Sequence, residues 1–421
     1  MEMIVLVLFI LGYLFITLEH SIKVNKASLA LLTGVLCWSV YMVGSTDVTV
    51  VSHSLLEHLS EISGILFFLM GAMTIVELVD AHDGFDVITS RINTNNKHTL
   101  LWIISVLAFL LSAVLDNLTT AIVMVSLLRK FLDDKEDRWL FSGMVIIAAN
   151  AGGAWSPIGD VTTTMLWIGG QITAVNIILK LILPSLVCLL VPLLLLSFNM
   201  KGSFVRPVIE KASNSMNSLF ERNVVFYLAL AALVFVPVFK TITHLPPFMG
   251  VMFGLAILWL VTELIHKNKN RVEKDTLSVA RALQKIDVPS ILFFLGILLA
   301  IAALQSVGHL HNLSTFMNEK IGNESIIVLI IGLFSAVIDN VPLVAATIGM
   351  YDLSAYPPDS FIWEFLAFCS GTGGSVLIIG SAAGVAVMGL EKIAFGWYLK
   401  KISWLALLGY FAGSIVYLLL N

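Results

Sequence analysis

The sequence predicts an all-α polytopic membrane protein built from two inverted-topology repeats, each with a re-entrant helical hairpin and an interrupted transmembrane helix. Of its 421 residues, 58% are hydrophobic and only 12% are charged, and the mean hydropathy is +0.95. These are too few charges to cover a soluble globule of this size. The string Ser-Ala-Val-apolar-Asp-Asn occurs twice, at 112–117 and 335–340. Corresponding landmarks recur at a spacing of roughly 221 to 226 residues, which indicates an internal duplication.

The first half, residues 1–200, contains continuous apolar spans and two irregular segments. The continuous spans are predicted at 3–18, 27–44, 61–80 and 172–197. The start, Met-Glu-Met, lacks a basic region and a cleavage site, so 3–18 is expected to be a membrane helix and not a signal peptide. Residues 98–132 are too long for one span of about 20 residues. With Asp116 and Asn117 at their midpoint, they predict a re-entrant hairpin. Residues 139–170 are interrupted by AANAGGAWSPIGDVTTT, whose glycines and proline break a helix and free backbone carbonyls.

The second half, residues 222–421, repeats this plan after a linker at 201–221. Runs at 222–240 and 248–265 correspond to the first two spans, and ILFFLGILLA at 291–300 corresponds to ILFFLMGAMT at 65–74. A hairpin at 324–350 carries Asp339 and Asn340. An interrupted segment then contains SGTGGSVLIIGSAAG, and a last span follows at 400–420.

The basic residues predict the orientation of the two copies. With the N-terminus outside and both hairpins returning to their starting side, 21 of the 24 Lys and Arg residues, Lys26 among them, fall on the cytoplasmic face. Each half then crosses the membrane five times, so the copies are inverted. Hairpin 98–132 enters from the cytoplasm and hairpin 324–350 enters from outside. The linker 201–221 is cytoplasmic, and the C-terminus is outside.

Carboxylates inside apolar sequence are the candidate functional residues. An ionised carboxylate at the bilayer centre costs roughly 3 kcal/mol or more, and such groups normally face a cavity or a transport path. Each hairpin tip is expected to face the interrupted helix of its own half. The first site would contain Asp116, Asn117, Thr119, Thr120, Asn150, Asp160, Thr162 and Thr163. The second would contain Ser335, Asp339, Asn340, Ser370, Thr372, Ser375 and Ser381. The membrane acids Glu61 and Glu77 are secondary candidates.

The predicted sites have the chemistry of a hard cation site. Their oxygen ligands suit such an ion, and neither set offers a lysine or arginine to hold an anion. Sodium is expected at the half with two acids, at Asp116, Asn117, Asn150 and Asp160. Two carboxylates in one low-dielectric cavity titrate as a coupled pair, so the same groups can hold either a sodium ion or protons. The sequence predicts transported ions, no cofactor and no catalytic residue.

Other roles and other classes of protein remain open at this stage. Asp116, Asp160 and Asp339 could each cap the helix that follows, and Thr162 and Thr163 could bond back to helix carbonyls. A channel is an alternative to a transporter. An enzyme is disfavoured because no His/Cys metal set, phosphate-binding glycine loop or Ser-His-Asp arrangement can be assembled. No basic patch large enough for nucleic acid is present, so the lipid bilayer is the expected macromolecular environment.

Four strings in the chain resemble the NhaD family of bacterial sodium/proton antiporters, within the ion transporter superfamily that also holds arsenite and dicarboxylate carriers. They are VLDNLTTAIVM, ANAGGAWSPIGDVTTTMLW, AVIDNVPLVAA and GTGGSVLIIGSAAGVA. The resemblance covers nearly the whole chain. It implies a homodimer in the bacterial cytoplasmic (inner) membrane that exchanges cytoplasmic Na+ or Li+ for external H+. An anion carrier of the same superfamily, for arsenite or a Na+-coupled dicarboxylate, is the alternative. The resemblance implies site roles for Asp116, Asn117, Asn150, Asp160, Thr162, Thr163, Ser335, Asn340 and Ser375.

Overall fold

The regular elements of the described part of the chain are helices. A computed structural model describes residues 2–200, 202–204 and 217–421. In these ranges eight helices are long and apolar enough to cross a membrane, and a ninth crossing arises if the bent pair at 382–391 and 395–401 is one span. The protein is therefore a multi-pass α-helical membrane protein, as predicted. Most of the predicted linker, Lys201 and 205–216, lies outside the described residues.

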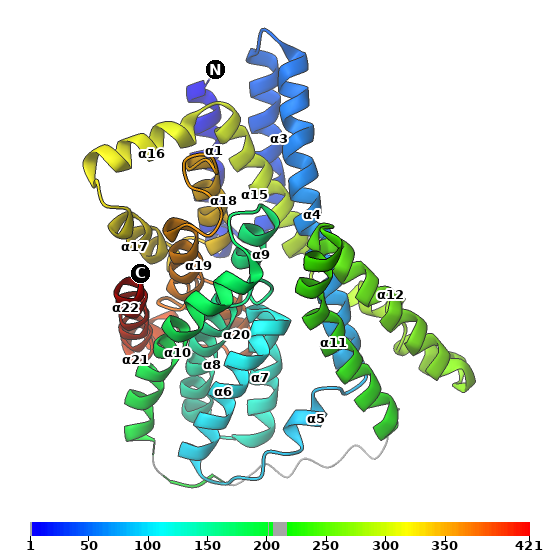
Figure 1. Cartoon of the computed structure of the whole chain (residues 1–421). Coiled ribbons are helices and arrows are strands. Elements are labelled where there is room, and N and C mark those ends of the chain that lie inside the picture. Colours follow the sequence, from blue (N-terminus) through cyan, green and yellow to red (C-terminus); the bar gives the residue numbers. More distant parts are fainter. Residues whose placement is uncertain (1, 201, 205–216) are drawn as a thin grey trace.

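One set of helices, here called the α3 group, occupies the upper and right parts of Figure 1. Helix α15 packs along α3, and α12 packs against both α4 and α11. Glycines allow the closest of these crossings, because a Cβ added to Gly34 would lie 2.6 Å from the carbonyl oxygen of Gly296. The members are α1 (Glu2–Thr17), α3 (Lys26–Gly44), α4 (Val48–Ala81), α11 (Leu219–Thr243), α12 (Pro247–Ile265) and α15 (Val288–Ser306).

The remaining long elements form the hairpin group, in which the two halves of the sequence interlock. Helix α7 packs on α20, α8 on α19 and α9 on α18. The members from the first half are α6 (Lys97–Leu115), α7 (Asn117–Phe131), α8 (Lys135–Ala154), α9 (Val161–Ile168) and α10 (Ala174–Asn199). Those from the second half are α17 (Glu324–Phe334), α18 (Asn340–Met350), α19 (Phe361–Gly373), α20 (Ala382–Glu391), α21 (Phe395–Lys401) and α22 (Ser403–Leu420). The short connecting elements are α2 (Glu19–Ile22), α5 (Asp86–Thr89), η1 (His266–Asn268), α13 (Arg271–Thr276), α14 (Val279–Lys285) and α16 (His309–Lys320).

Two hairpins lie at the predicted ranges 98–132 and 324–350. In the first, α6 and α7 run side by side in the lower half of Figure 1. Lys97, the first residue of α6, lies 2.5 Å from Asp137 at the start of α8, so α7 has returned to the level where α6 began. In the second, the Tyr356 hydroxyl after α18 donates to the Glu324 carboxylate at the start of α17, at 2.8 Å. Each hairpin therefore begins and ends at one level of the molecule.

The same hydrogen bond ties each hairpin to its interrupted helix. Ser112 near the end of α6 donates its hydroxyl to the carbonyl of Ala149 in α8, at 2.6 Å. Ser335 at the end of α17 donates to the carbonyl of Ser370 in α19, at 2.8 Å. These serines are the first residues of the two repeated strings. The interruptions themselves fall at 155–160 and 374–381, close to the predicted glycine-rich breaks.

Helix α4 is longer than the predicted span 61–80. It begins at Val48, where the Asp47 side chain accepts hydrogen bonds from the backbone N–H groups of Thr49 and Val50. Glu61 therefore does not open a helix. It lies within α4 with its side chain 74% exposed, and its carboxylate is 3.9 Å from the ring of His58. The predicted start at residue 61 was wrong, because hydropathy does not reveal a helix in the polar residues 48–60, whereas a good N-cap starts a helix in polar sequence as well.

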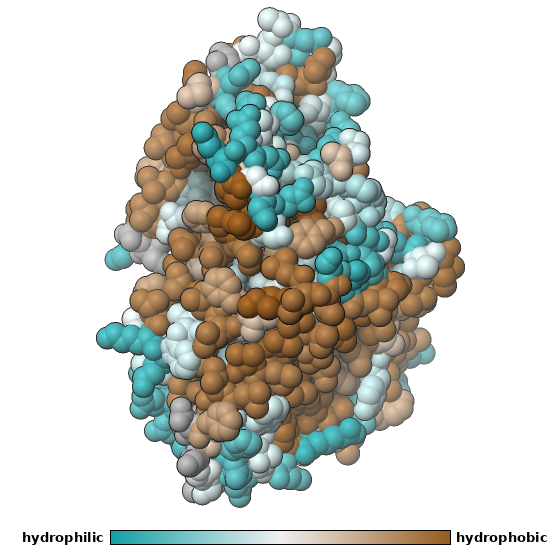
Figure 2. Space-filling model, turned by 60° about the vertical axis from the view of Figure 1, so that its left-hand side comes forward, coloured by the Kyte–Doolittle hydropathy of each residue, from teal (hydrophilic) through white to brown (hydrophobic). Residues whose placement is uncertain are grey.

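Basic residues gather where the first hairpin begins and ends, a region here called the basic face. They stabilise the buried Glu391 at the end of α20, whose carboxylate binds Arg129 Nε at 2.6 Å and Arg138 Nε at 3.1 Å. Away from this region, exposed apolar side chains cover much of the surface, and Figure 2 shows them as a continuous area across the middle of one face. Such a surface is typical of a protein embedded in hydrocarbon. The basic face contains Lys97, Arg129, Lys130, Lys135 and Arg138.

Candidate functional site

Asp160 is the centre of a polar cluster buried between the two halves. It is the N-cap of α9 and is 1% exposed. Its Oδ1 accepts hydrogen bonds from both the backbone N–H and the hydroxyl of Thr162, each at 2.9 Å. Its Oδ2 accepts a bond of 2.6 Å from the amide of Asn117. The amide of Asn340 donates weakly to both oxygens, at 3.4 and 3.5 Å. A carboxylate buried in a membrane protein needs such donors, because no water solvates it there.

Asn150 extends this cluster to the second interrupted helix. It is fully buried near the end of α8, and its Oδ1 accepts a hydrogen bond of 2.9 Å from Asn117. Its amide nitrogen donates to the hydroxyls of Ser375 and Ser381, at 2.9 and 3.0 Å. Both serines belong to the break between α19 and α20. The Asp160 cluster is therefore Asn117, Asn150, Asp160, Asn340, Ser375 and Ser381.

The expectation of two separate sites, one in each half, is wrong. Asn340 comes from the second hairpin but reaches Asp160 in the first half, and Asn150 of the first half reaches Ser375 of the second. The reason is that the halves interlock, so the two hairpin tips and the two helix breaks meet in one place. Their polar groups then satisfy one another, as buried polar groups must.

Asp116 lies beside this cluster at the tip of the first hairpin. Its carboxylate caps α7 by accepting bonds from the backbone N–H and the hydroxyl of Thr119, at 2.8 and 2.9 Å. Its φ angle of 78° is rare for a residue other than glycine, and such backbone strain persists mainly at functional sites. Asp116 and Asp160 line one cavity of about 20 Å³, whose other walls are mostly apolar. This is room for a single water-sized occupant in a cavity that two aspartates line.

Several predicted ligands are hydrogen-bonded to backbone carbonyls and not to the cluster. Thr163 donates to Asp160 O at 2.9 Å, and Ser335 is bonded to Ser370 as described above. Thr120 is fully buried, and its hydroxyl has no partner within the described residues. Two further hydroxyls bond back to their own helix, those of Ser370 to Leu366 O at 2.7 Å and of Thr372 to Phe368 O at 2.6 Å.

Asp339 makes contacts apart from the Asp160 cluster. It caps α18 by accepting a bond of 3.2 Å from the backbone N–H of Val341, and its Oδ2 lies 3.7 Å from Nζ of Lys26. The prediction that neither site offers a lysine is therefore wrong for the second hairpin. Lys26 was counted among the basic residues of the cytoplasmic face and not among the site residues, whereas it is the first residue of α3 and its side chain reaches Asp339. The sequence feature that could have indicated a specific partner for Lys26 is its position in the first turn of a helix, where the helix dipole disfavours a cation.

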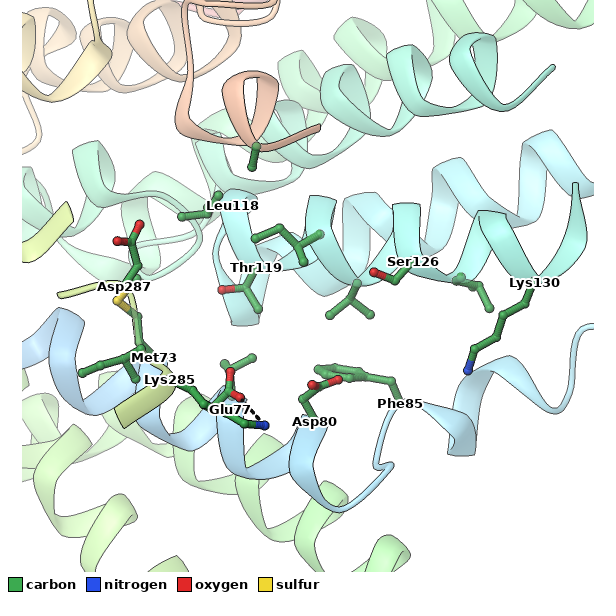
Figure 3. Close-up of a pocket in the computed structure, with 16 residues that line it drawn as sticks. Met73, Glu77, Asp80, Phe85, Leu118, Thr119, Ser126, Lys130, Lys285 and Asp287 are labelled. Carbon is green, nitrogen blue, oxygen red and sulfur yellow. Dashed lines mark ion pairs between the residues drawn. The ribbon is translucent and has the colours of Figure 1, made fainter. Parts of the chain in front are cut away.

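A larger cavity, of about 360 Å³, extends along α7 from Lys130 to Thr119 (Figure 3). It reaches Thr119, the residue that hydrogen-bonds to Asp116. Glu77 and Asp80 of α4 form part of the opposite wall, and Glu77 pairs with Lys285 at 3.1 Å. Of the two secondary candidates, Glu77 thus lines a route toward the predicted site. Glu61 does not line this cavity.

Comparison with known proteins gives a consistent set of relatives. Residues 5–363 match the model of the CitMHS family, described as citrate transporter. Sodium/proton antiporter 1 and sodium/proton antiporter 2 of Arabidopsis thaliana are 50% and 47% identical to the chain. Both alignments cover 98% of this chain, and they cover 71% and 98% of the respective relatives. The Na(+)/H(+) antiporter NhaD of Vibrio cholerae is 33% identical over 99% of this chain and 91% of its own length.

Proposed function

This chain belongs to the CitMHS family, described as citrate transporter, and to the NhaD group of sodium/proton antiporters, and we propose that it exchanges sodium ions for protons across its membrane. The observation that carries the proposal is the cavity of about 20 Å³ that Asp116 and Asp160 both line. An ion-sized space beside two carboxylates suits a small hard cation. The antiporters from Arabidopsis and Vibrio named above support the same activity.

Exchange follows from competition for the same two carboxylates. A sodium ion in the small cavity would be held by Asp116 and Asp160. Asn117 and Thr162, which donate to Asp160, and Asn150, which accepts from Asn117, would position the Asp160 carboxylate. A proton on either carboxylate removes the negative charge that holds the cation, so the site carries sodium or protons but not both. The Asp160 cluster joins both hairpins and both helix breaks, and a movement of the hairpin group against the α3 group would expose it alternately to the two sides.

An anion carrier is the second candidate, because the family description names citrate. The geometry of the cluster argues against it. Asp160 and Asp116 would repel a carboxylate substrate, and the hydrogen-bond partners found for the Asp160 cluster are amides, hydroxyls and backbone groups. Lys26 is directed at Asp339 and so is already neutralised.

The proposal includes the orientation of the protein in the membrane, lithium as a second transported cation, and a homodimer. By the positive-inside rule the basic face lies in the cytoplasm, with both termini outside, in a bacterial inner membrane. The 360 Å³ cavity, which Lys130 lines, would then be the cytoplasmic route for the cation. Lithium is expected to replace sodium, because it is also a small hard cation. The inverted repeats and a homodimer are inferred from the sequence pattern and the family resemblance.

A cysteine placed in the cavity tests this orientation. Ser126 of α7 is exposed on the cavity wall, while the native Cys37, Cys188 and Cys369 are buried and give little background. We expect a membrane-impermeant maleimide to label Ser126→Cys in everted vesicles and not in right-side-out vesicles. Ser142→Cys, at a fully buried position of α8, is expected to stay unlabelled in both. Labelling of Ser126→Cys only in right-side-out vesicles would reverse the proposed topology.

The activity is tested by dissipation of a proton gradient in everted vesicles that contain the protein. Addition of Na+ or Li+ is expected to collapse the gradient across alkaline pH, while K+ and citrate have no effect. Vesicles without the protein are the control. A response to citrate, with none to Na+ or Li+ at any pH, would reject the antiporter and favour the anion carrier.

A further inference from the structure

The ion pair between Lys26 and Asp339 links the two groups of helices. Lys26 begins α3, in the α3 group, and Asp339 caps α18, in the hairpin group. Nζ and Oδ2 are 3.7 Å apart, and the side chains are only 27% and 19% exposed. The ammonium also lies 4.5 Å from the centre of the Phe293 ring on α15. Because both charged groups are largely shielded from water, each is stabilised by the other. Removal of one partner leaves the charge of the other uncompensated.

The position of Lys26 within its helix is unfavourable for a cation. It is the first residue of α3, after the N-cap Asn25, where the partial positive charge of the helix dipole repels a cation. The backbone N–H of Lys26 donates to the Glu19 carboxylate at 3.2 Å, but this bond does not involve the ammonium. A lysine is therefore best explained here by what its side chain reaches, which is Asp339.

The corresponding residue of the first hairpin has no such partner. Asp116 occupies the same place in the repeated string as Asp339, and both cap the second helix of a hairpin. The Asp116 carboxylate accepts bonds from Thr119, and no ion pair between it and a lysine or arginine is found among the described residues. The first half thus keeps a carboxylate available for an external cation, whereas in the second half an ammonium of the protein is already beside the carboxylate.

We propose that the Lys26 ammonium is a resident cation, which fills beside Asp339 the place that a transported sodium ion takes beside Asp116. This inference rests on the proposed antiport. Lys26 then acts as a positioning residue that sets the number of sodium ions bound per chain to one. A cavity of about 250 Å³ lined by Glu19, Lys26 and Asp287 would let sodium reach the vacated place if the lysine were removed.

Equilibrium binding of radioactive sodium to the purified full chain tests this inference. The native protein and Lys26→Arg are expected to bind one sodium ion per chain, and Lys26→Met is expected to bind two. Lys23→Met removes a neighbouring exposed lysine and is expected to bind one. A change in fold alone would not raise the number of bound ions. One sodium per chain at native affinity in a folded Lys26→Met protein would overturn the proposal.

A second set of variants keeps the test decisive if Lys26→Met does not fold. Asp339→Asn leaves the ammonium unpaired next to Asn340, which contacts Asp160. We expect the sodium Kd to rise about tenfold through charge repulsion in a poorly solvated site. Adding Lys26→Met to Asp339→Asn removes that charge and is expected to restore the native Kd to within about threefold. Native affinity in Asp339→Asn would refute the inference. Absence of sodium binding to the native protein would instead refute the antiport itself, and this inference with it.

Discussion

Asp160→Asn is expected to lower the rate of sodium/proton exchange at least about 100-fold while the protein still folds. The substitution removes the buried charge that holds either ion, and about 2.7 kcal/mol of lost cation binding corresponds to this factor. Asparagine keeps the size of the side chain, and its oxygen can still accept from Thr162 at the N-cap of α9. The measurement is sodium-induced dissipation of a proton gradient in everted vesicles, divided by the amount of protein present.

Asp359→Asn provides a matched control for this loss. Asp359 is also an aspartate that accepts two hydrogen bonds from one threonine, Thr173, but it lies in an exposed segment and its carboxylate bonds to Thr173 and not to the Asp160 cluster. Its φ angle of 62° is one that asparagine tolerates well. Exchange is therefore expected to stay within about twofold of the native rate. Retention of more than about a tenth of the native rate in Asp160→Asn would show that another carboxylate carries the exchanged charge.

The hairpin tip and the helix break of the first half can be predicted well from the sequence, because the residues that cause them lie at those positions. Asp116 and Asn117 interrupt apolar sequence at the middle of a segment too long for one span, and the chain reverses there. Gly152, Gly153 and Pro157 lie in or next to the break between α8 and α9. A helix break depends on the residues at the break, so it can be recognised without knowledge of the tertiary structure.

The composition of the candidate site could not be predicted fully, because it depends on contacts across the sequence. The amide of Asn340 and the carboxylate of Asp160 are 180 residues apart, and their contact follows from the packing of α18 on α9. The contact between Lys26 and Asp339 could not be predicted for the same reason. The positive-inside rule only counts charges in loops. It cannot predict that the side chain of a lysine at the start of a helix reaches the tip of a distant hairpin.

Substitution of the glycines where each hairpin packs on its interrupted helix is expected to have the largest effect on folding. A Cβ added to Gly373 of α19 would lie 1.9 Å from the carbonyl oxygen of Gly332 in α17. The first half has the equivalent contact, since a Cβ on Gly152 of α8 would lie 2.2 Å from Phe109 O in α6. These obstacles are backbone atoms, which cannot rotate away as a flexible side chain does. A methyl group at either place would force two helices apart.

Gly373→Ala is therefore expected to destabilise the protein by about 3 kcal/mol or more, the upper range for overpacked cores. Separation of α17 from α19 would also pull Ser335 from Ser370 and disturb Asn340 at the Asp160 cluster. Fluorescence-detected size exclusion in mild detergent should show loss of the monodisperse peak.

Gly389→Ala provides the control, because Gly389 lies within α20 and a Cβ there meets no atom within 4 Å. Alanine favours a helix over glycine by about 0.5 to 1 kcal/mol, so this variant should melt at or slightly above the native temperature. A native elution profile and melting temperature for Gly373→Ala would contradict the proposed packing. It would mean that α17 and α19 can separate without loss of fold, and that the contact does not hold the second hairpin tip in the cluster.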